Sequence, residues 1–163
     1  MKYILLTVAT LGLVACGSQE VQHKSGTEHN AAETMGFTLS KAYINPPFPG
    51  RDVAAGFFNL TNNGVDDKLI AASSTLSENV EIHTHLMEDG VMKMRQTEAV
   101  DLPSGKTVEF KSGGYHLMIF NVSLPKDQNE ADITLIFEKS EPLTLTLPIG
   151  QPEEKSHGSH SEY

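Results

Sequence analysis

The chain has 163 residues, and its 21 Asp and Glu against 12 Lys and Arg give a net charge of −9 at pH 7. This acidity, with no basic patch, argues against a nucleic-acid-binding protein, because such proteins place cations against the phosphates. Cys16 is the only cysteine, so the chain can form no internal disulfide.

The chain begins with an apolar run. Lys2 precedes residues 3–14, which are too few to span a bilayer comfortably. The run ends in the word Leu-Val-Ala-Cys-Gly at 13–17, which resembles a bacterial lipobox. We therefore expect 1–15 to be a lipoprotein signal peptide and Cys16 to be lipidated. The mature protein would then be a lipoprotein anchored to a membrane on the periplasmic side of a bacterial cell envelope. An ordinary secretory signal with an incidental cysteine is the alternative.

Two polar segments flank the rest of the chain. Residues 16–34 carry almost nothing to bury, which predicts a flexible tether after the lipidated cysteine. Residues 150–163 predict a disordered tail, in which His157 and His160 either bind Cu(II) weakly or are simply solvated. Between them, 35–149 has the length of one domain.

Short runs separated by turn signals fill this domain, and no run of ten residues shows helical periodicity. The run 53–60 is apolar at nearly every position, so we expect a central strand buried on both faces. The spacing predicts an all-β Greek-key sandwich or barrel. The expected strands are 37–44, 53–60, 68–74, 80–85, 106–111, 115–120, 132–139 and 143–147.

Histidines and methionines recur at strand spacing in the middle of the domain. His83 and His85 share one face of a strand, and Met92 and Met94 share one face of the next. The Asp-Gly pair at 89–90 between the two runs indicates a hairpin. We expect this hairpin to bring Met94 back beside His83.

A second pair lies farther along the chain. His116 and Met118 project from one face of the predicted strand 115–120. With His83 and Met94 they would form a neutral, soft set of two imidazoles and two thioethers, which suits Cu(I) better than Zn(II), Mg(II) or Ca(II). Since a His or Met in a strand is usually a packing or surface residue, the residue types alone leave both interpretations open.

The spacing His-x10-Met-x21-His-x-Met resembles the signature of the PCu(A)C family of periplasmic copper chaperones. The resemblance covers about 35–149 and implies a cupredoxin-like fold. It departs from the family at Ser112, where a proline is usual, and His85 is an extra imidazole near the site with no assigned role. The words that carry it are Glu81-Ile82-His83, Asp89-Gly90-Val91-Met92-Lys93-Met94-Arg95 and Gly113-Gly114-Tyr115-His116-Leu117-Met118.

The resemblance implies that His83, Met94, His116 and Met118 are copper ligands. It implies an extracytoplasmic chaperone, a monomer, that delivers Cu(I) to the copper-binding subunit of cytochrome c oxidase or to another copper-assembly protein. A copper-buffering or sequestering surface lipoprotein without a dedicated acceptor is the alternative.

Other classes of function are disfavoured by the sequence. No nucleophile word such as Gly-x-Ser-x-Gly and no phosphate-binding glycine loop is present, so we expect no enzyme. Without a cysteine in the mature domain, the His-His-Cys site of a blue copper protein is excluded. The spacing also argues against a structural or adhesive lipoprotein with incidental histidines and methionines.

Overall fold

The computed structural model describes residues 32–34 and 36–151, and every regular element among them is a β-strand. The predicted signal peptide, Cys16, most of the tether, and His157 and His160 lie outside the described residues. The strands are β1 (Ala32–Thr34), β2 (Phe37–Asn45), β3 (Ala54–Asn62), β4 (Asp67–Ser74), β5 (Val80–Glu88), β6 (Val91–Gln96), β7 (Val100–Leu102), β8 (Thr107–Phe110), β9 (His116–Ile119), β10 (Glu130–Phe137) and β11 (Leu143–Pro148).

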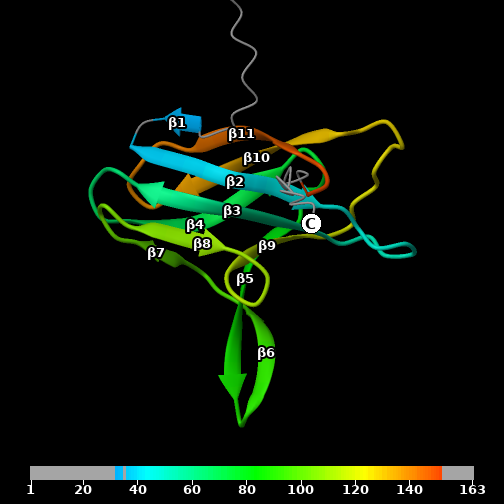
Figure 1. Ribbon diagram of the computed structural model, residues 1–163, viewed down its shortest axis with the longest axis horizontal. Helices are drawn as coiled ribbons and strands as arrows, with labels where there is room; N and C mark the ends of the chain where they lie inside the picture. The colour runs from blue at the N-terminus through cyan, green and yellow to red at the C-terminus, as the bar shows by residue number, and fades with distance from the viewer. Residues whose placement is uncertain (1–31, 35, 152–163) are drawn as a thin grey trace, which may run out of the picture.

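The strands form two antiparallel sheets that pack into a sandwich, as Figure 1 shows. The larger sheet runs β1-β2-β3-β9-β5-β6, with β8 beside β3, and the smaller runs β11-β10-β4-β7. A parallel bridge between Ile44 and Ile149 joins the sheets along one edge. The architecture confirms the predicted all-β sandwich.

Alternating burial explains why these segments become strands. Along β3 every second residue is buried and the others are half-buried, so one face packs into the core. The expectation that this strand is buried on both faces was therefore wrong. Its second face lies on the outside of the larger sheet, where side chains such as Tyr43 and Phe57 cover it with ring centroids 5.4 Å apart.

Aromatic stacking fills much of the core. Phe58 of β3 stacks on Phe110 of β8 with ring centroids 4.3 Å apart. Phe37 of β2 stacks on Phe137 of β10 at 4.2 Å, which ties one sheet to the other. Leu117 of β9 is fully buried among these residues. Burial of such side chains is the main source of stability in a domain of this size.

A buried carboxylate fastens the smaller sheet. Asp67 accepts hydrogen bonds from the backbone amides of Lys68, Lys139 and Ser140, at 2.7, 3.0 and 3.0 Å, and from the Ser140 hydroxyl at 2.6 Å. Burial raises the pKa of Asp67, but these hydrogen bonds outweigh it and hold the pKa below its usual value. The carboxylate therefore stays ionised and fully paired.

Two short strands, β1 and β7, were not predicted from the sequence. β1 falls within the predicted tether, because an edge strand needs only backbone pairing, here with β2, and no apolar side chains. β7 has three residues, with Val100 and Leu102 buried on either side of Asp101, and it is too short to show alternation. The other predicted strands match the observed ones to within a few residues.

Candidate metal centre

Strands β9, β5 and β6 carry the predicted ligands, and β5 lies in the middle. The first half of β5, Val80–His83, pairs with β9. From Thr84 onward β6 is its only partner. The two strands leave the sandwich there and project as a two-stranded ribbon, visible at the bottom of Figure 1. We call the paired residues 84–95 the ribbon.

The turn of the ribbon fixes its register. Asp89 and Gly90 have φ angles of 52° and 79°, the left-handed conformation that a two-residue type I′ turn requires. The predicted hairpin is thus confirmed. Met94 lies opposite His85, however, and not beside His83, which pairs with Gln96. The partner of Met94 is therefore two residues farther along β5 than expected. Glu88 belongs to the strand and not to the turn, which changes the register.

His116 is the buried member of the site. It lies on β9 directly opposite His83, with 5% of its surface exposed. Close packing holds β9 in place, since a Cβ on Gly56 of β3 would lie 3.2 Å from the Leu117 Cβ. The His116 Nδ1 is 3.0 Å from the carbonyl oxygen of Gly114. A carbonyl only accepts, so Nδ1 carries the proton and Nε2 keeps its lone pair.

That lone pair faces sulfur. The His116 Nε2 lies 3.2 Å from the Met94 Sδ. Burial lowers the pKa of His116, an effect that the Gly114 carbonyl opposes and that His85 and His83 reinforce. The ring is therefore neutral at pH 7, and the contact joins two lone-pair donors. Two ligands of one tetrahedral ion lie roughly 3.5 Å apart, given metal–nitrogen and metal–sulfur bonds of about 2.0 and 2.3 Å.

Two further imidazoles border this contact. The His83 Nε2 lies 2.7 Å from the Glu81 Oε2, and its ring centroid is 6.1 Å from that of His116. The His85 ring is closer, with centroids 5.4 Å apart. The Nδ1 atoms of both His83 and His85 are buried without a hydrogen-bond partner. Such atoms are costly to leave unpaired, and a bound cation would satisfy them.

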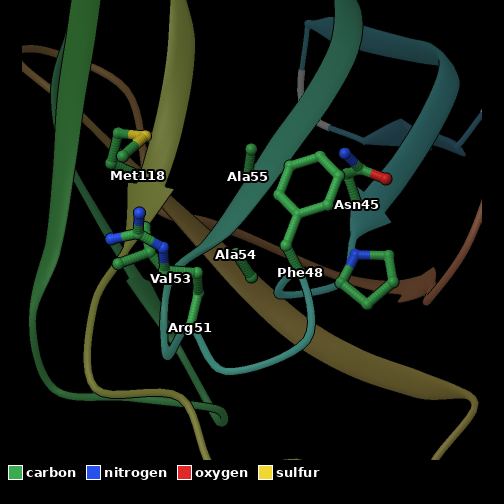
Figure 2. Close-up of a pocket in the computed structure, with 8 residues that line it drawn as sticks. Asn45, Phe48, Arg51, Val53, Ala54, Ala55 and Met118 are labelled. Carbon is green, nitrogen blue, oxygen red and sulfur yellow. The ribbon is translucent and has the colours of Figure 1, made fainter.

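Met118 approaches from the other side. Met118 lies opposite Glu81, and Met94 lies opposite His85. Along β5, the two thioethers therefore lie on either side of the pair formed by His116 and His83. Their partners Glu81 and His85 are four residues apart along β5, a distance of about 13 Å. Both unbranched methionine side chains must therefore reach toward His116 to share an ion. Met118 also lines a shallow pocket of about 290 Å³, shown in Figure 2 with Arg51 on the same side and Phe48 opposite.

The donor set depends on sulfur. Among residues 32–34 and 36–151, no three His, Cys, Asp or Glu side chains are arranged to hold a metal ion. The structure brings His116 and Met94 into contact, places His83 and His85 beside them, and leaves Met118 one rung away. In the same described part of the chain, no helix is long and apolar enough to cross a membrane.

Known proteins resemble this chain in sequence and in fold. A family described as "Putative lipoprotein LpqE-like" matches residues 37–149. The copper-bound PCuAC domain from PmoF2 superposes with a TM-score of 0.61 at 21% identity, covering 74% of this chain and 97% of that one. The apo PCuAC domain from PmoF1 also gives 0.61, at 20% identity, covering 74% and 98%. A comparison with curated proteins found no match.

A third relative extends over more of the chain. The solution structure of apo-DR1885 from Deinococcus radiodurans gives a TM-score of 0.54 at 19% identity, covering 93% of this chain and 97% of that one. These likenesses confirm the predicted PCuAC-type, cupredoxin-like sandwich. The names of these structures describe PCuAC domains or DR1885, and none describes an enzyme.

Proposed function

Because the chain belongs to the LpqE-like family and folds as a PCuAC-type domain, we propose that it is an extracytoplasmic copper chaperone that carries Cu(I). The observation that supports this most directly is the 3.2 Å contact between the His116 Nε2 and the Met94 Sδ. The relatives' names point the same way, since one PCuAC domain is described as copper-bound and DR1885 as a CuI form.

The chemistry of the donors suits a carrier. His83, Met94, His116 and Met118 are neutral, and thioethers prefer the reduced ion. Glu81 accepts the Nε2–H of His83, which leaves the unpaired Nδ1 of that ring as the nitrogen that can bind the ion, as outer carboxylates do in metal sites. With no anionic ligand, the ion is held by bonds that an acceptor's own donors can replace one at a time.

His85 is the auxiliary ligand in this proposal. It lies opposite Met94 with a buried and unpaired Nδ1, so it can replace His83 or Met118 while the ion is in transit. X-ray absorption on the Cu(I)-loaded protein tests the ligand types. With one equivalent of Cu(I), we expect mixed nitrogen and sulfur scattering, and a weaker sulfur component in Met94→Leu, Met118→Leu. Scattering from nitrogen alone in the unaltered chain would contradict the proposal.

The acceptor we propose is the copper-binding subunit of cytochrome c oxidase. A strain lacking the protein should lose oxidase activity and oxidase copper at limiting copper, and added copper should restore both. The gene for His83→Ala, His116→Ala should not restore them, whereas the unaltered gene should. Normal oxidase with reduced copper tolerance would instead support the buffering alternative.

The ends of the chain complete the proposal. Cys16 would carry the lipid anchor at the periplasmic face of a membrane, in keeping with the lipoprotein description of the family. Mass spectrometry of membrane fractions should find an acylated residue 16 at the mature N-terminus. A soluble mature protein with a free thiol would refute the anchor.

We also propose that His157 and His160 in the tail bind Cu(II), because imidazole without thioether favours the oxidised ion. Deleting residues 151–163 should remove one Cu(II) site and leave Cu(I) binding unchanged. Equal Cu(II) stoichiometry in the full and shortened chains would show that the tail is only solvated.

A further inference from the structure

We propose that Met87 and Met92 form a second, outer Cu(I) site, through which the ion enters and leaves the inner site around His116. The two methionines are direct partners in the β5–β6 ladder. They occupy the rung next outward from His85 and Met94, on the same face of the ribbon, because side chains two residues apart share a face. The inference rests on the proposed copper function.

Packing does not explain these side chains. Met87 is 66% exposed and Met92 is 58% exposed, and Met94 behind them is 42% exposed. The ribbon projects away from the sandwich (Figure 1), and more than half of the surface of Met87 and of Met92 is exposed. Methionine on a surface ribbon gains little from the hydrophobic effect, which leaves metal coordination as the property that its sulfur adds.

The two faces of the ribbon differ in chemistry. The other face carries Glu88, whose carboxylate binds Lys93 at 3.0 Å and Arg95 at 2.9 Å. Hydrogen bonds from Lys93 and then Arg95 lower the pKa of Glu88, so the carboxylate stays charged. All the charge of the ladder thus lies opposite to the methionines. A soft cation meets only neutral sulfur and nitrogen donors along the Met87 face.

The spacing allows a shared ion. Directly opposed residues in an antiparallel pair have Cβ atoms about 5 Å apart. Two sulfurs that bind one ion in a line need a separation of roughly 4.6 Å, taking about 2.3 Å for each metal–sulfur bond. Rotation of the long Met87 and Met92 side chains covers this range. Two thioethers without imidazole would bind Cu(I) more weakly than the inner set does.

Transfer then needs no change of charge or oxidation state. As the ion moves inward, its bonds to the Met87 and Met92 sulfurs break while bonds to the Met94 sulfur and the His116 nitrogen form. Met94 is two residues from Met92 on the same face, so it can receive the ion before the outer bonds are lost. Release to an acceptor follows the same steps in reverse.

The test uses the chain from Cys16 onward, with its methionines labelled at the methyl carbon and Ag(I) as a redox-stable substitute for Cu(I). We expect the first equivalent to shift the methyl signals of Met94 and Met118, and a second equivalent to shift those of Met87 and Met92. Met87→Leu, Met92→Leu keeps the size and apolarity of both side chains. It should abolish the second step and slow Cu(I) transfer to a chelator about tenfold, with inner-site affinity unchanged within about twofold.

A matched control restores the number of sulfurs without their pairing. Leu86→Met, Val91→Met, added to that double variant, places both thioethers on the charged face, and it should not restore transfer. The proposal is overturned if the Met87 and Met92 signals in the unaltered chain never respond, or if the double variant transfers Cu(I) at the normal rate. In those cases a response at Met94 would still support the proposed function, and silence at Met94 and Met118 would refute it.

Discussion

The sandwich and the ribbon use apolar side chains for different purposes. In the sandwich, Phe58, Phe110 and Leu117 are buried almost completely. In the ribbon, the large apolar side chains are exposed, although the backbone is paired just as regularly. Strand formation alone therefore does not reveal what an apolar residue contributes. In this chain, the residues that we propose to bind copper lie on both sides of the point where β5 leaves β9, with His83, His116 and Met118 in the sandwich and Met94 in the ribbon.

His116 and Met94 meet at this boundary. His116 is buried on β9, a strand paired on both sides, whereas Met94 is exposed on β6, an edge strand paired only with β5. The contact between them joins one donor fixed by the core to another that depends on the ribbon. The following predictions separate the two regions.

The largest effect is expected from a cavity in the sandwich. Phe58→Ala removes a buried ring that stacks on Phe110, and such changes lower the free energy of unfolding by about 3–5 kcal/mol. Met92→Ala in the ribbon should cost less than about 0.5 kcal/mol, because the side chain is mostly exposed. Urea unfolding of the apo protein measures both. Equal losses of unfolding free energy in the two variants would contradict the view that the sandwich, and not the ribbon, stabilises the fold.

The next effect concerns copper and not stability. Loss of a residue that only supports a metal ligand weakens binding by up to about 100-fold. Because His116 is itself a proposed ligand, His116→Ala should weaken Cu(I) binding by at least about 100-fold. Competition with a Cu(I) chelator gives the affinity. His85→Ala is the matched control, since it removes an imidazole from the same face, and we expect a smaller loss. If His85→Ala costs more than His116→Ala, the two histidines have exchanged roles.

A third prediction places a polar change in the sandwich. Asp67→Asn should lower the free energy of unfolding by about 1–3 kcal/mol, because an amide cannot satisfy all the donors that the carboxylate accepts. Cu(I) affinity, measured beside the unaltered protein, should not change. A loss of affinity would show that the smaller sheet and the metal centre are coupled.

The smallest effect is a dependence on pH. Burial lowers the pKa of His116 below its ordinary 6.5, so the unfolded chain takes up a proton before the folded one does. The contribution of His116 to apo stability is therefore fully present above pH 6.5. It is lost progressively as the pH falls from there through the lowered pKa. Urea unfolding between pH 7.5 and pH 5 should show this decline, and His116→Phe should remove it. An unchanged slope in that variant would assign the decline to other groups.

Much of this molecule could be predicted from the sequence, for identifiable reasons. Period-two alternation gave most strands, and Asp-Gly gave the hairpin, because both signals are local. The rung that pairs Met94 with His85 also follows from a two-residue turn, but only once Glu88 is assigned to the strand. The short strand β7 carries too few residues for a pattern.

The nonlocal part could not be predicted. The closeness of His85 to His116 depends on how β9 is placed against β5, and the packing of Gly56 on Leu117 helps to hold β9 there. Gly56 lies far from the ligands in sequence, and the position of Leu117 between His116 and Met118 does not reveal that Gly56 and Leu117 pack together. Likewise, the half-buried outer face of β3 depends on what covers the larger sheet, which the strand's own composition does not reveal.

The ribbon consists of only two paired strands, and this affects how often it opens. A lone two-stranded hairpin is marginally stable in water, and hairpins form in about 1–10 μs. Opening of the ribbon can therefore withdraw Met94 from the ion many times while β9, which is paired on both sides, keeps His116 in position. Hydrogen exchange should then find the amides of β6 far less protected than those of β9. The lifetime of the bound ion would be governed by a local opening, long before the domain itself unfolds.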